Sequence, residues 1–399
     1  MTRSSGPAPV SDIDIYSDEV LADPYRAYRA LRDAGPAVQL STHPVWVIAR
    51  YADARAALQD WQAFSSAEGV AMTEEMNANM RGSVLAADPP EHDVLRAVLS
   101  EKLAPRALAK LRDEISERAD AIVAEAVANG TFDAVTDLSA RLPVEVVADF
   151  IGLAPEGRER LLPGSDAVFA TFGPLDARMH ARMPAFQSYF AYMQSFSDRS
   201  KLAPGSWGAA IWEAVDDGRI APESAVSLMN AYLVAAMDTT VHALGSYLRF
   251  LAEDPQRWTT LKADPGLIGS GFEETLRIES PVQGFYRLTT RDVDVDGVLV
   301  PARSRVAVLN AAACRDERHY PDPDRFDIRR NPVDHLAFGY GIHGCAGQGL
   351  ARIEARALIG SLLRRVDSIQ LAGEPVRHLH PVLRGLEQLP VTVVPSKDE

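Results

Sequence analysis

One cysteine of this chain lies in a glycine-rich stretch suited to holding a metal ligand. Residues 338–347 read Phe-Gly-Tyr-Gly-Ile-His-Gly-Cys-Ala-Gly, which places Cys345 among four glycines. Glycines leave the backbone bare, so a flat macrocycle can approach the sulfur without meeting bulky side chains. A helix predicted from about residue 346 to beyond 365 would bring its positive dipole end near the thiolate. The pattern predicts a thiolate ligand to a planar metal cofactor, and a structural cysteine in a plain turn is the alternative.

A second group of reactive residues interrupts an apolar segment. Asp238, Thr239 and Thr240 lie in the middle of residues 223–253, which are apolar over most of their length. Buried polar groups are costly without a partner, so three of them together need a reason. An acid beside a hydroxyl can relay protons into a cavity. The alternative is a threonine that bonds back within its helix and an aspartate that caps a neighbour.

Together these motifs resemble those of the cytochrome P450 family. Residues 338–347 match its Phe-Gly-x-Gly-x-His-x-Cys-x-Gly loop, and residues 235–240 resemble its oxygen-activating motif, with Ala236 in place of the usual glycine. The resemblance implies haem b (iron protoporphyrin IX) bound through Cys345. It also implies a monooxygenase that uses dioxygen, with Asp238 and Thr239 as its catalytic pair. The other cysteine, Cys314, is expected to be a buried, inert thiol.

The resemblance assigns two further sets of residues. The Glu-x-x-Arg motif is Glu274 and Arg277, and Arg325 of the following proline-rich segment is expected to join this pair and brace the cysteine loop. Cations are needed to bind the two carboxylates of a buried haem. The residues that match this role in the family are His92, Arg96, Arg287 and His343.

The substrate prediction also rests on a resemblance. Residues 279–292 resemble a bacterial subgroup that oxidises para-substituted benzoates, so we expect hydroxylation or O-demethylation of a small aromatic substrate. The helix has Asn230 and Ala231 where an arginine and a serine would help to hold an acid, so a neutral phenol or methoxyarene stays open. The residues expected to contact substrate are Arg81 and Ser83, as carboxylate anchors, with Val168, Phe169, Phe172, Ala235, Val282 and Phe285.

The elements that must position these residues are mostly helices. Apolar periodicity predicts helices over residues 105–129 and 223–253, the second unusually long. Short strands are expected over residues 291–300, with a hairpin turn at Asp296-Gly297, and over 305–309 and 389–394. The fold class is therefore mostly α, with a long central helix and a minor β part in the second half. We expect one cytochrome P450 domain over residues 1–399.

Composition limits the partners and the compartment. The chain has 41 basic and 55 acidic residues, a net charge of −14, which disfavours nucleic acid and anionic membranes. Two cysteines exclude a disulfide framework, and no apolar run of 18 residues is present, so a cytoplasmic protein is expected. The resemblance to the family implies an electron donor, usually a small acidic ferredoxin reduced by an NAD(P)H-dependent reductase. A basic cluster over residues 96–112, with Arg352 and Arg356, is the expected docking patch for it. The alternatives are a terpenoid or other secondary-metabolite hydroxylase and a non-catalytic haem protein.

Overall fold

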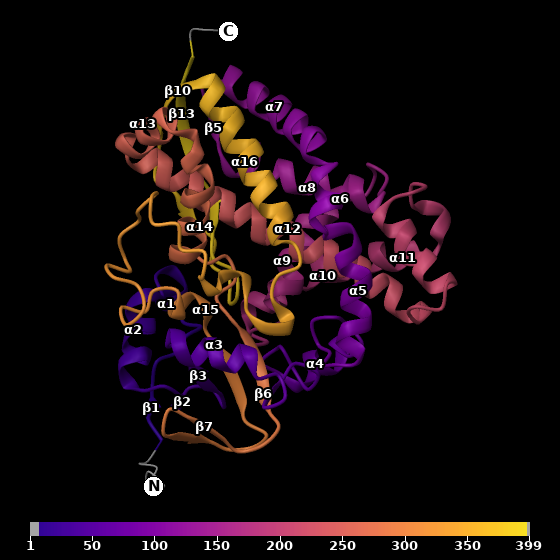
Figure 1. Ribbon diagram of the computed structural model, residues 1–399, viewed down its shortest axis with the longest axis vertical. Coiled ribbons are helices and arrows are strands. Elements are labelled where there is room, and N and C mark those ends of the chain that lie inside the picture. Colours follow the sequence, from indigo (N-terminus) through magenta and orange to yellow (C-terminus); the bar gives the residue numbers. More distant parts are fainter. Residues whose placement is uncertain (1–7, 397–399) are drawn as a thin grey trace.

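The computed structural model describes residues 8–396, and helices dominate them, as predicted (Figure 1). The α-helices are α1 (Asp18–Ala22), α2 (Tyr25–Ala34), α3 (Tyr51–Gln59), α4 (Glu74–Met80), α5 (Glu91–Leu103), α6 (Pro105–Ala109), α7 (Arg112–Ala128), α8 (Arg141–Ile151), α9 (Leu161–Ala170), α10 (Ala177–Gln194), α11 (Trp207–Asp216), α12 (Pro222–Glu253), α13 (Pro255–Ala263), α14 (Ile268–Ile278), α15 (Asn310–Ala313) and α16 (Gln348–Arg365).

The strands form small sheets. They are β1 (Val10–Ser11), β2 (Val38–Leu40), β3 (Trp46–Ile48), β4 (Phe64–Ser65), β5 (Thr131–Asp133), β6 (Phe285–Thr289), β7 (Val293–Val295), β8 (Val298–Val300), β9 (Arg305–Val308), β10 (Val366–Leu371), β11 (Val376–Arg377), β12 (Leu386–Gln388) and β13 (Pro390–Pro395). The largest sheet has the order β1-β2-β3-β9-β6-β4, and a second has the order β10-β13-β5.

The β prediction was right in kind but incomplete. The β7–β8 hairpin turns at Asp296 and Gly297, which have φ of 45° and 89°, as its sequence predicted. The expectation that strands lie only in the second half was wrong, because β1 to β5 come from the first half. These strands are two or three residues long, too short for an alternating pattern to show. They are fixed by pairing with distant strands, as Trp46 of β3 does with Val306 of β9.

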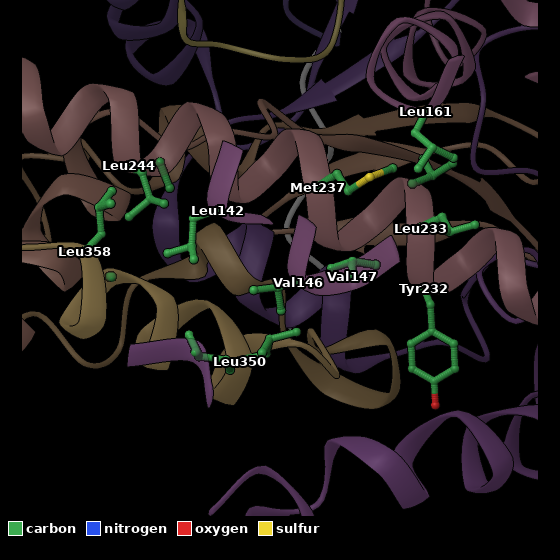
Figure 2. Packing of buried hydrophobic residues seen from close by; sticks show 14 of the residues in the cluster. Leu142, Val146, Val147, Leu161, Tyr232, Leu233, Met237, Leu244, Leu350 and Leu358 are labelled. Atoms are coloured by element: carbon green, nitrogen blue, oxygen red, sulfur yellow. The ribbon is translucent and has the colours of Figure 1, made fainter. Parts of the chain in front are cut away.

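The long central helix was predicted almost to its ends. α12 has Pro222 in its first turn and stops at Asp254, which caps α13 by accepting a hydrogen bond from the Gln256 N–H at 3.0 Å. Helices α8, α9, α14 and α16 pack against it. Figure 2 shows the apolar side chains that these helices interleave around α12: Leu142, Val146, Val147, Leu161, Tyr232, Leu233, Met237, Leu244, Leu350 and Leu358.

The helix predicted over residues 105–129 is broken into α6 and α7. The Lys110 N–H bonds the Ala107 carbonyl at 3.2 Å, and the Leu111 N–H bonds the Leu108 carbonyl at 3.0 Å. These hydrogen bonds, each to the residue three positions earlier, tighten the turn and change the direction of the chain before α7 begins at Arg112. Periodicity alone does not reveal the break, because apolar residues continue on both sides of it.

Candidate active site

The cysteine loop is shaped by two glycines. Gly339 and Gly341 have φ of 70° and 69°, a region that side chains with a Cβ rarely adopt. At Gly341 a Cβ would also lie 2.4 Å from the Leu58 carbonyl oxygen. Within the loop the Cys345 N–H donates to the Phe338 carbonyl at 2.7 Å, which closes the turn. The sequence pattern therefore has a direct backbone cause.

The Cys345 sulfur lies at the N-terminus of α16 and lines a cavity with Ala235 and Thr239 of α12. Burial raises the pKa of the thiol, while the N–H groups of Gly347 and Gln348, together with Arg96, oppose the rise by favouring the thiolate. A buried thiol that faces a cavity and is surrounded by N–H donors is suited to bind a metal as thiolate. Cys314 is different, because it is fully buried and its pKa is raised to about 11.

Four basic groups gather beside this loop, and within the described chain only His92 bonds an acid, Asp93 at 2.9 Å. Arg96 donates to the Gly344 carbonyl, and His92 and His343 meet edge to face with ring centroids 4.6 Å apart. The Nε2 atoms of both histidines are buried without a hydrogen-bond partner in the described chain. Burial lowers the pKa of His343 to about 2, helped by Arg287, His92 and Arg96. Arg96 and Arg287 bring positive charge without a bonded acid, and the free Nε2 atoms of the two histidines can form hydrogen bonds. Both features fit an anionic ligand, such as the two carboxylates of the haem that the motifs imply.

The expected Glu274–Arg277 ion pair is present, but the arginine that joins it is not the predicted one. Glu274 and Arg277 are fully buried and bonded at 2.7 and 2.9 Å, and Arg277 also donates to the Cys314 and Pro323 carbonyls. The prediction that Arg325 joins them was wrong, because its side chain is 64% exposed and pairs with Asp327. Arg330 takes the place, with Nε 3.0 Å from Glu274 Oε1. The turn after Asp327 brings Arg330 inward, which residue spacing alone does not indicate.

The acid and the hydroxyl of the central helix face different ways. Thr239 lines the cavity and donates to the Ala235 carbonyl at 2.7 Å, so its oxygen can still accept a hydrogen bond from the cavity side. Asp238 does not line the cavity. Its carboxyl is buried, one oxygen lacks a partner in the described chain, and burial raises its pKa well above the ordinary range. Burial therefore favours the protonated, uncharged form of the Asp238 carboxyl.

Behind Asp238 lies a buried polar cluster. Asp166 of α9 is 2.6 Å from His378 Nε2 and also 2.6 Å from Arg182 Nε. His242, one turn beyond Asp238, stacks on His378 with centroids 5.3 Å apart, and burial lowers its pKa to about 3. The cluster extends from buried His242 to His378, Asp166 and Arg182, which are partly exposed, and the charge of Asp166 helps to raise the pKa of Asp238.

The cavity beyond the cysteine has an aromatic wall. Phe172 lies between Phe169 and Phe285, with ring centroids 6.0 and 5.3 Å away. The expected substrate residues that line the cavity are Ser83, Val168, Phe169, Phe172, Ala235, Val282 and Phe285. The fold thus brings together four segments far apart in sequence, and an apolar, aromatic lining suits a small ring-containing ligand.

The placement of Arg81 in the substrate site was wrong. Its side chain is 68% exposed, it does not line the cavity, and its nearest acid is Glu74 at 3.5 Å. Arg81 follows the last residue of α4 and turns outward there, while Ser83, two residues later, reaches the cavity.

Sequence reasoning missed Glu354, which lines the cavity together with Cys345. Both of its carboxyl oxygens are buried without a partner among the described residues, and burial raises its pKa to about 8. Glu354 lies on α16, nine residues after Cys345. This spacing was the only sequence signal for its position beside the cavity.

Exposed basic residues lie on α6, at the junction of α6 with α7, and in the middle of α16. Arg106, Lys110, Arg112 and Arg356, which we call the basic surface, are exposed and form no ion pair within residues 8–396. α16 packs against α6 and α7, so these residues belong to neighbouring elements (Figure 1). Arg352 is not part of the basic surface, because Glu273 binds it at 2.6 Å. In the described residues no helix is long and apolar enough to cross a membrane.

Comparison with known proteins gives consistent results. The profile of a family described as Cytochrome P450 matches residues 270–380. A curated relative, Cytochrome p450 CYP199A2 of Rhodopseudomonas palustris, is 40% identical, covering 96% of this chain and 94% of the relative. Vitamin D(3) 25-hydroxylase of Pseudonocardia autotrophica is 32% identical, covering 96% of both chains. The solved structure of Cytochrome P450 CYP109Q5 from Chondromyces apiculatus has a TM-score of 0.82 at 32% identity, covering 96% of this chain and 99% of that one.

Proposed function

The chain belongs to the cytochrome P450 family of haem-dependent monooxygenases, and on this premise we propose that it hydroxylates or O-demethylates a small para-substituted aromatic compound. The observation that carries the substrate class is the wall formed by Phe169, Phe172 and Phe285 in the cavity that Cys345 also lines. The resemblance of residues 279–292 to a benzoate-oxidising subgroup supports the same class.

Five residues are proposed to hold the cofactor. Cys345 would hold the iron through its thiolate, Arg96 and Arg287 would supply positive charge for the two propionates, and His92 and His343 would form hydrogen bonds with them. Arg287 is buried, and burial lowers its pKa to about 10, with Asp88 opposing. A carboxylate placed beside it would remove part of that penalty. When bound, thiolate-ligated haem supplies the activation of dioxygen with two electrons, so that one oxygen atom enters the substrate and the other leaves as water.

The remaining chemistry concerns protons and water. The reaction consumes two protons, and we assign Asp238 a role in supplying them because burial favours the protonated form of its carboxyl. Thr239, the next residue, lines the cavity, and its oxygen can accept a hydrogen bond from a group in the cavity. In the proposal, this hydrogen bond orients that group toward the reacting oxygen. The apolar lining excludes bulk water, which limits loss of the reactive oxygen to side reactions.

Electrons are proposed to come from an acidic ferredoxin that binds the basic surface. That surface contrasts with the net charge of −14 of the whole chain, so a partner with negative charge would be steered to it. It lies on α6, α7 and α16, and α16 is also the helix that begins after Cys345.

The test is substrate-dependent turnover with a ferredoxin and its NAD(P)H-dependent reductase. A para-substituted methoxyarene should stimulate NADH consumption and yield formaldehyde with the corresponding phenol, because a hydroxylated methyl group loses formaldehyde. A panel that includes terpenoids and a sterol serves as comparison, since one relative is a vitamin D(3) hydroxylase. Preference for the polycyclic compounds would reject the aromatic assignment.

A further inference from the structure

The cavity has a polar end built from the first half of α12. Ser227 and Asn230, three residues apart and so on one helix face, both line the cavity. Thr239 lies nine residues beyond Asn230, about 13 Å along the helix axis. A substrate oxidised near Thr239 can therefore present its far end to Asn230.

Asn230 is held by a tyrosine from another helix. The Tyr189 hydroxyl of α10 donates to Asn230 Oδ1 at 2.7 Å. Tyr189 is completely buried, and burial raises the pKa of its hydroxyl, so it keeps its proton and needs an acceptor. Gly164 of α9 packs so closely on Tyr189 that a Cβ there would lie 2.2 Å from the tyrosine Cβ, which fixes the ring in place.

This hydrogen bond determines which atoms Asn230 presents. Its carbonyl oxygen is occupied by Tyr189, and the opposite orientation of the amide would leave the buried Tyr189 proton without an acceptor. The Asn230 amide nitrogen bonds no described residue, and the side chain lines the cavity. Asn230 therefore offers two N–H donors and no charge.

The basic side chains that line the cavity are Arg96, Arg287 and His343, and all three gather at the cysteine loop, where burial lowers the pKa of His343 to about 2. Arg81 lies outside it. A carboxylate that reached Asn230 would be buried opposite neutral donors only, which is costly. An uncharged acceptor pays a much smaller desolvation cost for the same hydrogen bonds.

We infer that Asn230, anchored by Tyr189, is a donor subsite that selects an uncharged aromatic substrate with a carbonyl group para to the position that is oxidised. The inference rests on the proposed function and names its substrate class more closely. A ketone, ester or amide carbonyl would accept from the Asn230 amide, while the ring lies against the phenylalanine wall.

The experiment is calorimetric titration of the haem-loaded protein with three para-substituted anisoles of similar size. They are 4-methoxyacetophenone, the anion 4-methoxybenzoate and the apolar 4-ethylanisole. One net hydrogen bond should make the wild type bind the ketone about five- to tenfold more tightly than 4-ethylanisole. The benzoate should bind at least tenfold more weakly than the ketone. Tighter binding of the benzoate, or equal binding of the ketone and 4-ethylanisole, would overturn the inference.

Two variants assign the effect to the subsite. Asn230→Leu keeps the volume and removes the donors, so it should abolish the preference for the ketone while leaving 4-ethylanisole affinity unchanged. Tyr189→Phe keeps the amide but removes its anchor, so it should reduce the preference in part. An unchanged ketone preference in Asn230→Leu would refute the subsite, even where turnover of methoxyarenes proceeds. Binding with the expected pattern but no oxidation would instead reject the proposed function.

Discussion

Two arginines of the proline-rich segment, five residues apart, should differ sharply in what they contribute to stability. Arg330 donates through Nε to the fully buried Glu274 at 3.0 Å and through Nη1 to the Pro321 carbonyl at 2.7 Å. Arg325 is largely exposed and meets only Asp327, at 3.2 Å. We therefore compare Arg330→Met with Arg325→Met.

The expected magnitudes follow from burial. Arg330→Met removes one of the two cations bound to Glu274, and breaking a buried pair costs about 3–5 kcal/mol. Because Arg277 and the Asp327 N–H stay bound to Glu274, we expect the lower end, about 3 kcal/mol. Arg325→Met removes an exposed pair worth about 0–1 kcal/mol.

The assay is urea unfolding of the holoprotein, followed by far-UV circular dichroism. With a slope of about 3 kcal/mol/M or more, Arg330→Met should lower the midpoint by up to about 1 M, and Arg325→Met by no more than about 0.3 M. Equal shifts, or a larger shift for Arg325→Met, would refute the reasoning that the buried third partner of the cluster is Arg330.

Three further predictions concern other parts of the molecule. Thr239→Ala should still bind substrate and consume NADH, but peroxide should replace much of the product; unchanged coupling of NADH to product would count against the proton role. Burial alone would raise the pKa of Glu273, but hydrogen bonds from His335 and Arg352 lower it from 4.5 to about 2. The stability that ionised Glu273 contributes is therefore complete above about pH 5 and is lost as the pH falls toward 2. Glu273→Gln should therefore be less stable than wild type at pH 7, and the gap in urea midpoints should narrow between about pH 5 and pH 3; a constant gap would contradict the ion pair. Arg112→Glu on the basic surface should slow reduction by an acidic ferredoxin, as should added salt for the wild type, whereas salt-independent rates would indicate an apolar contact.

The parts of the site that could be predicted are those set by short, local patterns. The positive φ values of Gly339 and Gly341 have a cause within the ten-residue loop, and Pro222 and Asp254 mark the ends of α12. The spacing of Glu274 and Arg277 puts them on one helix face, and the resemblance to the family marked them as the buried pair. Such features need no knowledge of distant partners.

The parts that could not be predicted depend on contacts between distant segments. Arg330 and Arg325 lie in one irregular stretch, and only the path of the turns decides which reaches Glu274. Arg81 and Ser83 are two residues apart, yet one faces solvent and the other the cavity. Asn230 acquires its orientation from Tyr189, 41 residues earlier, and no pattern within α12 shows that bond.

The measurement that tests the central claim most directly is the spectrum of the reduced protein with carbon monoxide. If Cys345 is the axial ligand, the wild type and Cys314→Ala should both show the red-shifted band typical of thiolate ligation, and Cys345→His should bind haem without that band. Loss of the band in Cys314→Ala and its persistence in Cys345→His would contradict the account.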